Sequence, residues 1–168
     1  MEITQSDFNE TLRISQYVKT IDSIDAEYAL LISDEIFDKQ PFFLSVLLGY
    51  HLDVLPEELE EIMKLYFIMW EYFKSNSRIP ANKITEDDFV RIEKKNIQML
   101  EYAQGEPTEE QRILLYSDDL QNTRSKALWP AIFLRFQIRP VLINMKWQTT
   151  ASVIVGIKSF IECFETIK

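Results

Sequence analysis

The sequence predicts an all-α fold: a compact bundle of about eight helices, joined mostly by short loops, in a single domain over residues 1–168. Apolar residues recur at steps of three and four along most of the chain, which is the spacing of one helix face. Capping residues and prolines recur where helices would begin, and the segments between helices are short. Glycine occurs three times in the whole chain, which disfavours the tight turns of β-hairpins.

Start signals predict four helices in the first half of the chain. The first runs from near Asp7 to Ile21, and the second follows after a short break and ends near Phe37. Pro41 and Pro56 open the third and fourth helices, because proline is tolerated in the first turn of a helix. The fourth helix has the clearest apolar stripe, and we expect that stripe to be the centre of the core: Leu59, Ile62, Met63, Tyr66, Phe67, Trp70 and Phe73.

The fifth and sixth predicted helices follow the longest expected loop, residues 76–83. Thr85 is the predicted N-cap of the fifth helix, and Gly105 is expected to end it. A capping-box pattern over residues 108–111 predicts the start of a short sixth helix that reaches Leu120.

The seventh predicted helix covers about residues 126–145, and its two prolines either delimit it or kink it. The last helix is expected to begin near Thr149 or Ser152. Gly156 is expected to mark a close helix crossing, because a residue without a Cβ lets two backbones approach. The predicted buried stripe of the last helix is Val153, Ile157, Phe160, Ile161, Phe164 and Ile167.

The composition predicts a soluble, cytoplasmic protein. Its one cysteine, Cys163, cannot form an intrachain disulfide, and the first residues lack the layout of a secretory signal. The longest apolar runs are either too short for a membrane span or interrupted by Arg135 and Arg139. The net charge of −9 disfavours nucleic acid and anionic membranes as partners. No cofactor is predicted, and the sequence leaves homo-oligomerisation open.

Several kinds of catalytic site are excluded by residues that the sequence lacks. His51 is the one histidine, which excludes a zinc site built from several histidines. Gly49, Gly105 and Gly156 stand apart from one another, so neither glycine-rich nucleotide fingerprint is present. A Cys163 thiol activated by His51 is a further candidate, but we favour a structural role for both residues. The sequence therefore favours a protein without catalytic activity.

A metal site made of carboxylates is the remaining catalytic alternative. Glu57, Glu58 and Glu61 lie at the start of the fourth helix, and Glu57 and Glu61 are four residues apart on one face. The stretch resembles the Glu-Glu-x-x-Glu motif of all-helical nucleotide pyrophosphatases, which implies Mg²⁺-dependent hydrolysis of a nucleotide. Such enzymes carry a Glu-x-x-Asp helix downstream, whereas residues 93–96 here read Glu-Lys-Lys-Asn. We favour the simpler interpretation that these acids stabilise the positive end of the helix dipole.

Charge is unevenly distributed along the chain. No Asp or Glu occurs from residue 120 to residue 161. After residue 119 there are seven basic and two acidic residues, a net charge of +5. Since the whole chain carries −9, the first 119 residues carry −14. The basic segment is therefore the part of the chain that would bind acidic groups, either within the protein or on another molecule.

Arg135 and Arg139 are the candidate binding residues of this segment. They share a helix face at a spacing of four, and Trp129 precedes Arg135 by six residues. Two guanidinium groups beside an aromatic ring would fit a phosphate or a carboxylate, because arginine offers a planar fork of donors. We favour the alternative that both arginines are mostly buried and paired with carboxylates of the acidic helices. A third interpretation is that the basic face meets an acidic face of another molecule.

No motif in the sequence identifies a function. By elimination, the sequence predicts a non-catalytic helical protein, an adaptor or accessory subunit, that binds another protein through an apolar or charged surface. The alternative is a protein that binds or hydrolyses an anionic small molecule, either at the arginine pair or at a Mg²⁺ ion held by Glu57, Glu58 and Glu61. A concave pocket that unites these groups would favour the alternative, and arginines already paired would favour the first hypothesis.

Overall fold

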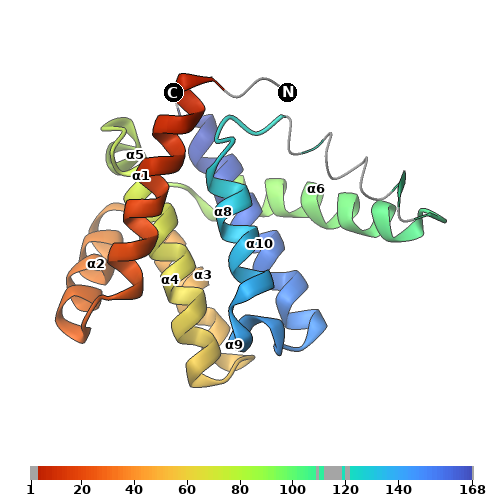
Figure 1. Cartoon of the computed structure of the whole chain (residues 1–168), viewed down its shortest axis with the longest axis horizontal. Helices are drawn as coiled ribbons and strands as arrows, with labels where there is room; N and C mark the ends of the chain where they lie inside the picture. The colour runs from red at the N-terminus through yellow and green to blue at the C-terminus, as the bar shows by residue number, and fades with distance from the viewer. Residues whose placement is uncertain (1–3, 109, 112–118, 120–121, 168) are drawn as a thin grey trace.

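The chain folds as a bundle of α-helices, which confirms the predicted fold class. The structure is a computed structural model that describes residues 4–108, 110, 111, 119 and 122–167. It is 81% helical, and the described residues contain no strand. Figure 1 shows the elements, which are α1 (Gln5–Asp22), α2 (Ala26–Lys39), α3 (Pro41–Gly49), the 3₁₀ turn η1 (Tyr50–Leu52), α4 (Pro56–Phe73), α5 (Arg78–Ala81), α6 (Glu86–Gly105), α8 (Leu128–Ile138), α9 (Pro140–Ile143) and α10 (Trp147–Thr166).

Several helices begin where the start signals predict them. Pro41 and Pro56 are the first residues of α3 and α4. The Thr85 hydroxyl accepts a hydrogen bond from the backbone N–H of Asp88 at 3.2 Å and so caps α6, which ends at Gly105 as predicted. Local residue preferences therefore define the boundaries of these elements.

The region predicted as one seventh helix consists of two helices. Pro140 begins α9, and the residue before it, Arg139, has an extended backbone with φ −89° and ψ 114°. A proline ring disfavours the helical conformation of the preceding residue, so Pro140 delimits α8 instead of kinking a longer helix. The last helix begins at Trp147, slightly earlier than predicted, and the predicted loop over residues 76–83 contains the single turn α5.

The central helix of the bundle is α4. Every residue from Leu65 to Trp70 is buried, so the core surrounds this part of the helix on all sides. The indole N–H of Trp70 donates to Glu35 Oε2 on α2 at 3.1 Å, which satisfies the one polar atom of a fully buried ring. A helix that is apolar around its whole circumference belongs in the interior of a bundle. The sequence prediction that α4 is the core is confirmed.

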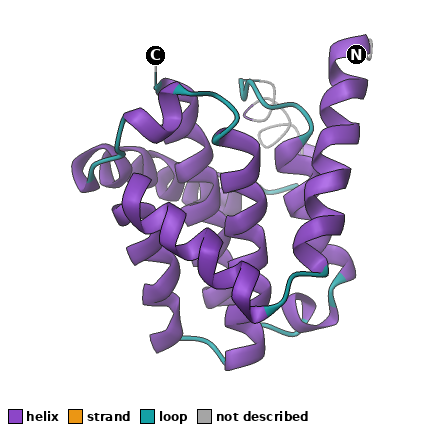
Figure 2. Cartoon of the chain, turned by 90° about the vertical axis from the view of Figure 1, so that its left-hand side faces the viewer, coloured by secondary structure: helices purple, strands orange, loops and turns teal. Residues whose placement is uncertain are grey.

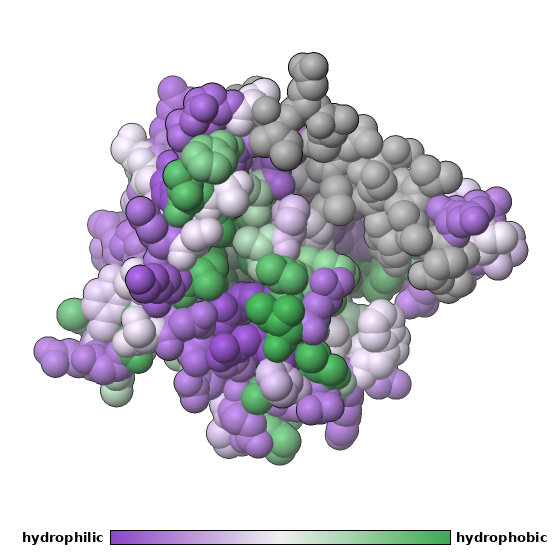
Figure 3. Space-filling model, viewed as in Figure 1, coloured by the Kyte–Doolittle hydropathy of each residue, from purple (hydrophilic) through white to green (hydrophobic). Residues whose placement is uncertain are grey.

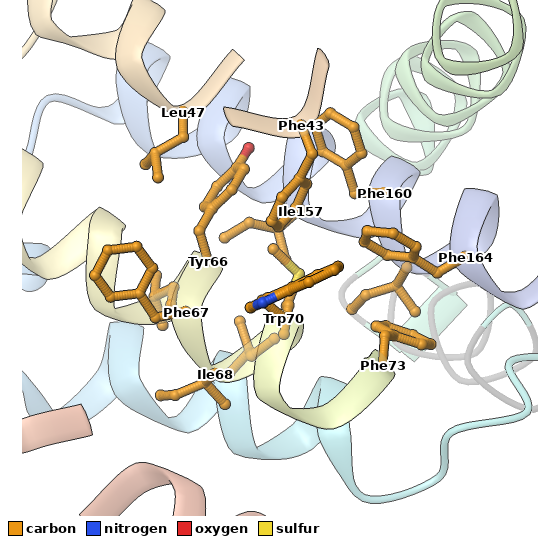
Figure 4. Close-up of a cluster of buried hydrophobic side chains, with 14 of the residues drawn as sticks. Phe43, Leu47, Tyr66, Phe67, Ile68, Trp70, Phe73, Ile157, Phe160 and Phe164 are labelled. Carbon is orange, nitrogen blue, oxygen red and sulfur yellow. The ribbon is translucent and has the colours of Figure 1, made fainter. Parts of the chain in front are cut away.

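Aromatic rings join α3, α4 and α10 in the middle of the core (Figure 4). The centroid of the Phe43 ring lies 4.8 Å from those of both Tyr66 and Phe160. Phe164 stacks on Phe73 at 4.8 Å, one turn further along α10. Such ring pairs add to the free energy gained by burying their area. They fix the face that α10 presents to α4, which is the predicted stripe.

The close approach at Gly156 on α10 involves the side chains of Tyr50 in η1 and Tyr66 in α4, and not the crossing of two helix backbones that the sequence predicted. A Cβ atom at this position would overlap the hydroxyl of Tyr50 and lie 3.5 Å from that of Tyr66. The two tyrosine hydroxyls are hydrogen-bonded to each other at 3.1 Å. The absence of a side chain at Gly156 therefore makes room for this buried polar pair.

Gln40, between α2 and α3, is a buried polar residue that fixes the segment around α5. Its Nε2 donates to the carbonyl oxygens of Ile79 at 2.7 Å and Asn82 at 2.8 Å, and its Oε1 accepts from the N–H of Ile84 at 2.9 Å. Buried backbone groups need such partners, because leaving them unpaired costs free energy. One side chain thus satisfies three backbone groups of the connection between α4 and α6.

The remaining sequence predictions concern the sixth helix and membrane spans. The predicted sixth helix lies mostly outside the described residues. At its expected start, the Thr108 hydroxyl accepts from the N–H of Gln111 at 3.2 Å, which is one half of a capping box, and donates to Gln111 Oε1 at 3.0 Å. Within the described ranges, no helix combines the length and the hydropathy needed to cross a bilayer.

Candidate functional site

Arg135 lies where α8 meets α1 and α4. It is in the last turn of α8, and only 4% of its surface is exposed. It donates two parallel hydrogen bonds to Asp22 at the end of α1, Nη1 to Oδ2 at 3.0 Å and Nη2 to Oδ1 at 2.6 Å. Bidentate geometry makes this the strong form of an arginine–carboxylate pair. The pair connects the basic segment of the chain to the acidic one.

Glu61 on α4 joins the two arginines. It accepts from Arg139, Nε to Oε2 at 3.0 Å and Nη2 to Oε1 at 2.6 Å. Arg135 Nη2 lies 3.4 Å from the same Oε2, and Lys64 Nζ lies 3.4 Å from Oε1. Glu61 is 6% exposed, so three cations hold its charge in place of water. The prediction that the arginines pair with carboxylates of the acidic helices is confirmed. We call Asp22, Glu61, Arg135 and Arg139 the charge cluster.

Arg139 is less buried than the sequence predicted. Its side chain is 35% exposed, whereas that of Glu61 is 8% exposed. The backbone break before Pro140 explains the difference, because it places Arg139 at the end of α8 and the start of α9. Arg135 is enclosed, and its Nε is a buried donor without an acceptor among the described residues.

The ion pairs keep both carboxylates of the charge cluster in the charged form. Hydrogen bonds from Arg135 lower the pKa of Asp22 below its usual value, against a smaller opposing effect of burial. Burial acts to raise the pKa of Glu61, but the hydrogen bonds from Arg139 and the charge of Lys64 together outweigh it and lower that pKa. A general acid or base instead has a pKa near the working pH. The carboxylates of the charge cluster therefore stay ionised and hold α1, α4 and α8 together.

The three glutamates of the predicted metal site have separate contacts. Glu58 accepts a hydrogen bond from the backbone N–H of Leu55 at 2.8 Å and so caps α4. Glu61 binds the arginines, and Glu57 is exposed in the first turn. In the described part of the chain, no group of three His, Cys, Asp or Glu side chains is placed to hold a metal ion. The structure does not bring these carboxylates together.

Trp129 lines a hollow on the surface of α8. The hollow has a volume of about 420 Å³, and its lining consists of Trp129, Pro130, Phe133, Leu134 and Gln137. The Trp129 and Phe133 rings lie 6.3 Å apart, centroid to centroid. None of the lining residues is charged, so the hollow suits an apolar group. The structure thus places Trp129 beside an apolar hollow, whereas the two arginines bind Glu61, so the three residues do not line one anion site.

The outward face of α8 is apolar although it is exposed. Phe133, Leu134 and Ile138 are 43%, 50% and 58% exposed. Pro130 and Gln137 complete this face, and we call these five residues the α8 patch. Figure 3 shows apolar surface over α8 in the middle of this side of the molecule. A helix with one face on a core normally carries charged residues on the opposite face, so the α8 patch departs from that rule.

His51 and Cys163 have the structural roles that we favoured. Cys163 is 3% exposed, and burial raises its pKa to about 12. A thiol with such a pKa is not a useful nucleophile at neutral pH, because the thiolate is the reactive species. His51 is exposed on η1, and its Nδ1 lies 2.6 Å from the carbonyl oxygen of Leu48.

Two features of the structure were not predicted from the sequence. Glu61 was considered as a metal ligand, but its spacing of four from Leu65 placed it on a face of α4 that turns to the core. The α8 patch was not singled out, because most residues of the seventh predicted helix are apolar and the sequence does not mark which of its sides faces solvent. The one sequence signal for the α8 patch was the absence of charge at residues 130, 133, 134, 137 and 138, which share a helix face.

Comparison with known proteins assigns no relative. No protein-family model matches the chain, and neither does any curated protein or solved structure. We therefore argue the function from the all-α fold, the charge cluster and the α8 patch alone.

Proposed function

We propose that this protein is a non-catalytic, intracellular helical accessory protein that binds a partner protein through the α8 patch. The proposal rests on one observation, an exposed helix face with three large apolar side chains and no charge. Charged residues are depleted at the centre of protein interfaces, and aromatic anchors are enriched there. The hollow beside Trp129 would receive an apolar anchor of the partner.

The contacts of the arginines support this proposal over the binding of an anionic small molecule. A phosphate or carboxylate ligand would have to displace Asp22 or Glu61 from hydrogen bonds of 2.6 Å. The displaced carboxylate of Glu61 would stay in a nearly dry environment without its partners, at a cost of several kcal/mol. The arginines are thus already occupied by groups of the protein itself.

A pull-down from extract of the native cell tests the proposal. The wild type and the variants Phe133→Gln and Leu134→Gln would be immobilised, and the retained proteins quantified by mass spectrometry. We expect at least one protein whose retained amount is about tenfold or more lower with each variant than with the wild type. A tenfold loss of affinity corresponds to about 1.4 kcal/mol, which is the contribution of one interface anchor. Val90→Gln on α6 is the control, because Val90 is an apolar residue of similar exposure, 49%.

Two results would contradict the proposal. One is a set of retained proteins that is identical for the wild type and both α8 variants. The other is strong stabilisation of the wild type by a phosphorylated metabolite with Mg²⁺ in a thermal-shift screen, since ligand binding raises apparent stability by mass action. If the retained partner is a second copy of the chain, the α8 patch is a homodimer interface.

A further inference from the structure

A second exposed apolar surface lies on α2, and its chemistry differs from that of the α8 patch. Leu30, Leu31 and Phe37 are 62%, 61% and 67% exposed. Glu27, Asp34 and Asp38 alternate with them at helical spacing, so that six residues form one face of α2. We call this face the α2 patch. It combines apolar side chains with three negative charges, whereas the α8 patch has none.

The position of α2 explains why this face is open. Ile32 and Ile36 on the opposite side of the helix are buried in the core. In Figure 1 α2 forms the left-hand edge of the molecule, and Figure 2 turns that edge toward the viewer. Single exposed apolar residues are common on protein surfaces, but three large ones within three turns of one helix form a patch that invites a partner.

The acidic residues of the α2 patch are available to a partner. Within the described residues, neither Glu27 nor Asp34 has an ion-pair partner, and Asp38 contacts only its neighbour Lys39, at 2.7 Å. The Asp38 side chain is 70% exposed. Glu27 and Asp34 therefore present negative charge that no described residue neutralises, and Asp38 stays exposed although it pairs with Lys39.

We infer that the α2 patch binds a basic amphipathic helix of a partner protein, in a second interaction separate from that of the α8 patch. Apolar residues of such a helix at i, i+3, i+4 and i+7 would pack on Leu30, Leu31 and Phe37. Its flanking Lys and Arg side chains would pair with Glu27, Asp34 and Asp38, which supplies specificity and a fast rate of association.

Charge decides against three other occupants of the α2 patch. An anionic membrane surface attracts basic amphipathic helices and repels acidic ones. Nucleic acid requires positive charge at the contact. A second copy of the chain, with the α2 patch packed on itself, would bring Glu27, Asp34 and Asp38 of both copies together and would be disfavoured by like-charge contacts.

Fluorescence anisotropy tests the inference with two labelled peptides of equal length. One peptide carries a leucine stripe with lysines on its polar face, and the other replaces every lysine by glutamate. We expect the full chain to bind the lysine peptide and not the glutamate peptide. Binding should weaken with added salt, because exposed charge pairs are screened.

Matched variants separate the α2 patch from the general acidity of the protein. Phe37→Gln and Asp34→Lys should each weaken binding of the lysine peptide at least about tenfold, a loss of about 1.4 kcal/mol. Glu101→Lys makes the same change in net charge at an exposed position of α6 and should leave binding within about twofold of the wild type. Phe133→Gln in the α8 patch should also have no effect, so that failure here is distinguishable from failure of the proposed function.

Three results would overturn the inference. One is equal loss of binding in Asp34→Lys and Glu101→Lys, which would mean nonspecific attraction to an acidic protein. Another is equal binding of the lysine and glutamate peptides. The third is binding of phosphatidylserine vesicles in preference to the lysine peptide. Circular dichroism checks that each variant is folded. If Phe37→Gln is unfolded, the result for Asp34→Lys decides the outcome, because that substitution alters one exposed side chain.

Discussion

Arg135 shows how a charged residue is retained in the interior of this protein. Its guanidinium is nearly inaccessible, and the bidentate contact with Asp22 and the longer contact with Glu61 replace the lost hydration. A buried pair of this kind adds little to stability compared with apolar residues of the same shape, yet removal of one partner leaves the other uncompensated. Its effect is thus to fix how α8 docks on α1.

Arg135→Met is predicted to lower the free energy of unfolding by about 3 kcal/mol, the lower end of the range for a broken buried pair, because Asp22 keeps partial contact with water. The urea midpoint measures this change. Arg91→Met is the matched control, since the Arg91 side chain is 72% exposed and pairs with Asp88 at 3.3 Å. The control should cost less than about 1 kcal/mol. Equal effects of the two substitutions would contradict the structural role of Arg135.

The same pair predicts a dependence of stability on pH. The pKa of Asp22 is lower in the folded protein than in the unfolded chain, where it is about 3.9. Acid therefore favours the unfolded chain, and the stabilisation by Asp22 is present at neutral pH and is lost as the pH falls below about 4. The difference in unfolding free energy between the wild type and Asp22→Asn should shrink from pH 7 to pH 3. A difference that is constant over this range would show that Asp22 is not paired.

At the scale of elements, the sequence predicted most boundaries and fewer of the contacts between helices. Pro41, Pro56 and Thr85 act through the backbone of their own turn, so their effect can be predicted from local sequence. Glu61 and Gln40 bind residues far away along the chain, and only the folded structure brings those partners to them. A contact at long sequence distance leaves no periodic signal. The sequence could therefore predict that Arg135 and Arg139 pair with carboxylates, but not which carboxylates these are.

The close contact between Gly156 and the Tyr50 side chain predicts opposite effects of two Gly→Ala substitutions. Gly156→Ala should destabilise the protein, because the new methyl group meets the Tyr50 hydroxyl. Gly49→Ala should be neutral or stabilise by up to about 1 kcal/mol, because no atom lies within 4 Å of its Cβ position and alanine favours the helix. Thermal melting curves measure both changes.

Removal of the Tyr50 hydroxyl provides a control for this contact. In the Tyr50→Phe background, the nearest atom of that ring lies 3.7 Å from the Cβ position, which is an ordinary contact. Gly156→Ala should therefore be less destabilising in this background than in the wild type. An equal cost in both backgrounds would contradict the proposed overlap.

Gln40 predicts local opening of the segment around α5. Gln40→Met keeps the volume of the side chain but removes the partners of three backbone groups, and we expect a cost of at least about 2 kcal/mol. Hydrogen exchange of the Ile84 amide, which donates to Gln40 in the wild type, should become faster. Unchanged protection of that amide would show that the hydrogen bond does not form in solution.

At the scale of the whole molecule, one core holds helices from both the acidic and the basic segments together. Trp70 is fully buried at its centre, and Trp70→Ala should cost about 3–5 kcal/mol, as expected for deletion of a large buried aromatic side chain. Chemical denaturation followed by circular dichroism measures this value. A change below about 1 kcal/mol, typical of surface substitutions, would show that Trp70 is exposed.

Some charges of the acidic segment (residues 1–119) and of the basic segment (residues 120–168) pair with each other inside the molecule, and others are exposed on its surface. Arg135 and Arg139 neutralise acids of α1 and α4, while Glu27 and Asp34 of the α2 patch have no ion-pair partner among the described residues. The apolar α8 patch and the acidic α2 patch then give two surfaces of different chemistry. The charge cluster joins α1, α4 and α8, and we expect that its arginines do not bind an external anion.

The melting temperature of the wild type and of Arg139→Ala, each with and without inorganic phosphate, tests this claim directly. Arg139→Ala removes two hydrogen bonds from the buried Glu61. A loss of about 2 kcal/mol should lower the melting temperature by about 4–8 °C, and phosphate should shift neither protein. If the variant is instead as stable as the wild type, and phosphate raises the melting temperature of the wild type alone, then the two arginines form an anion receptor and the claim is contradicted.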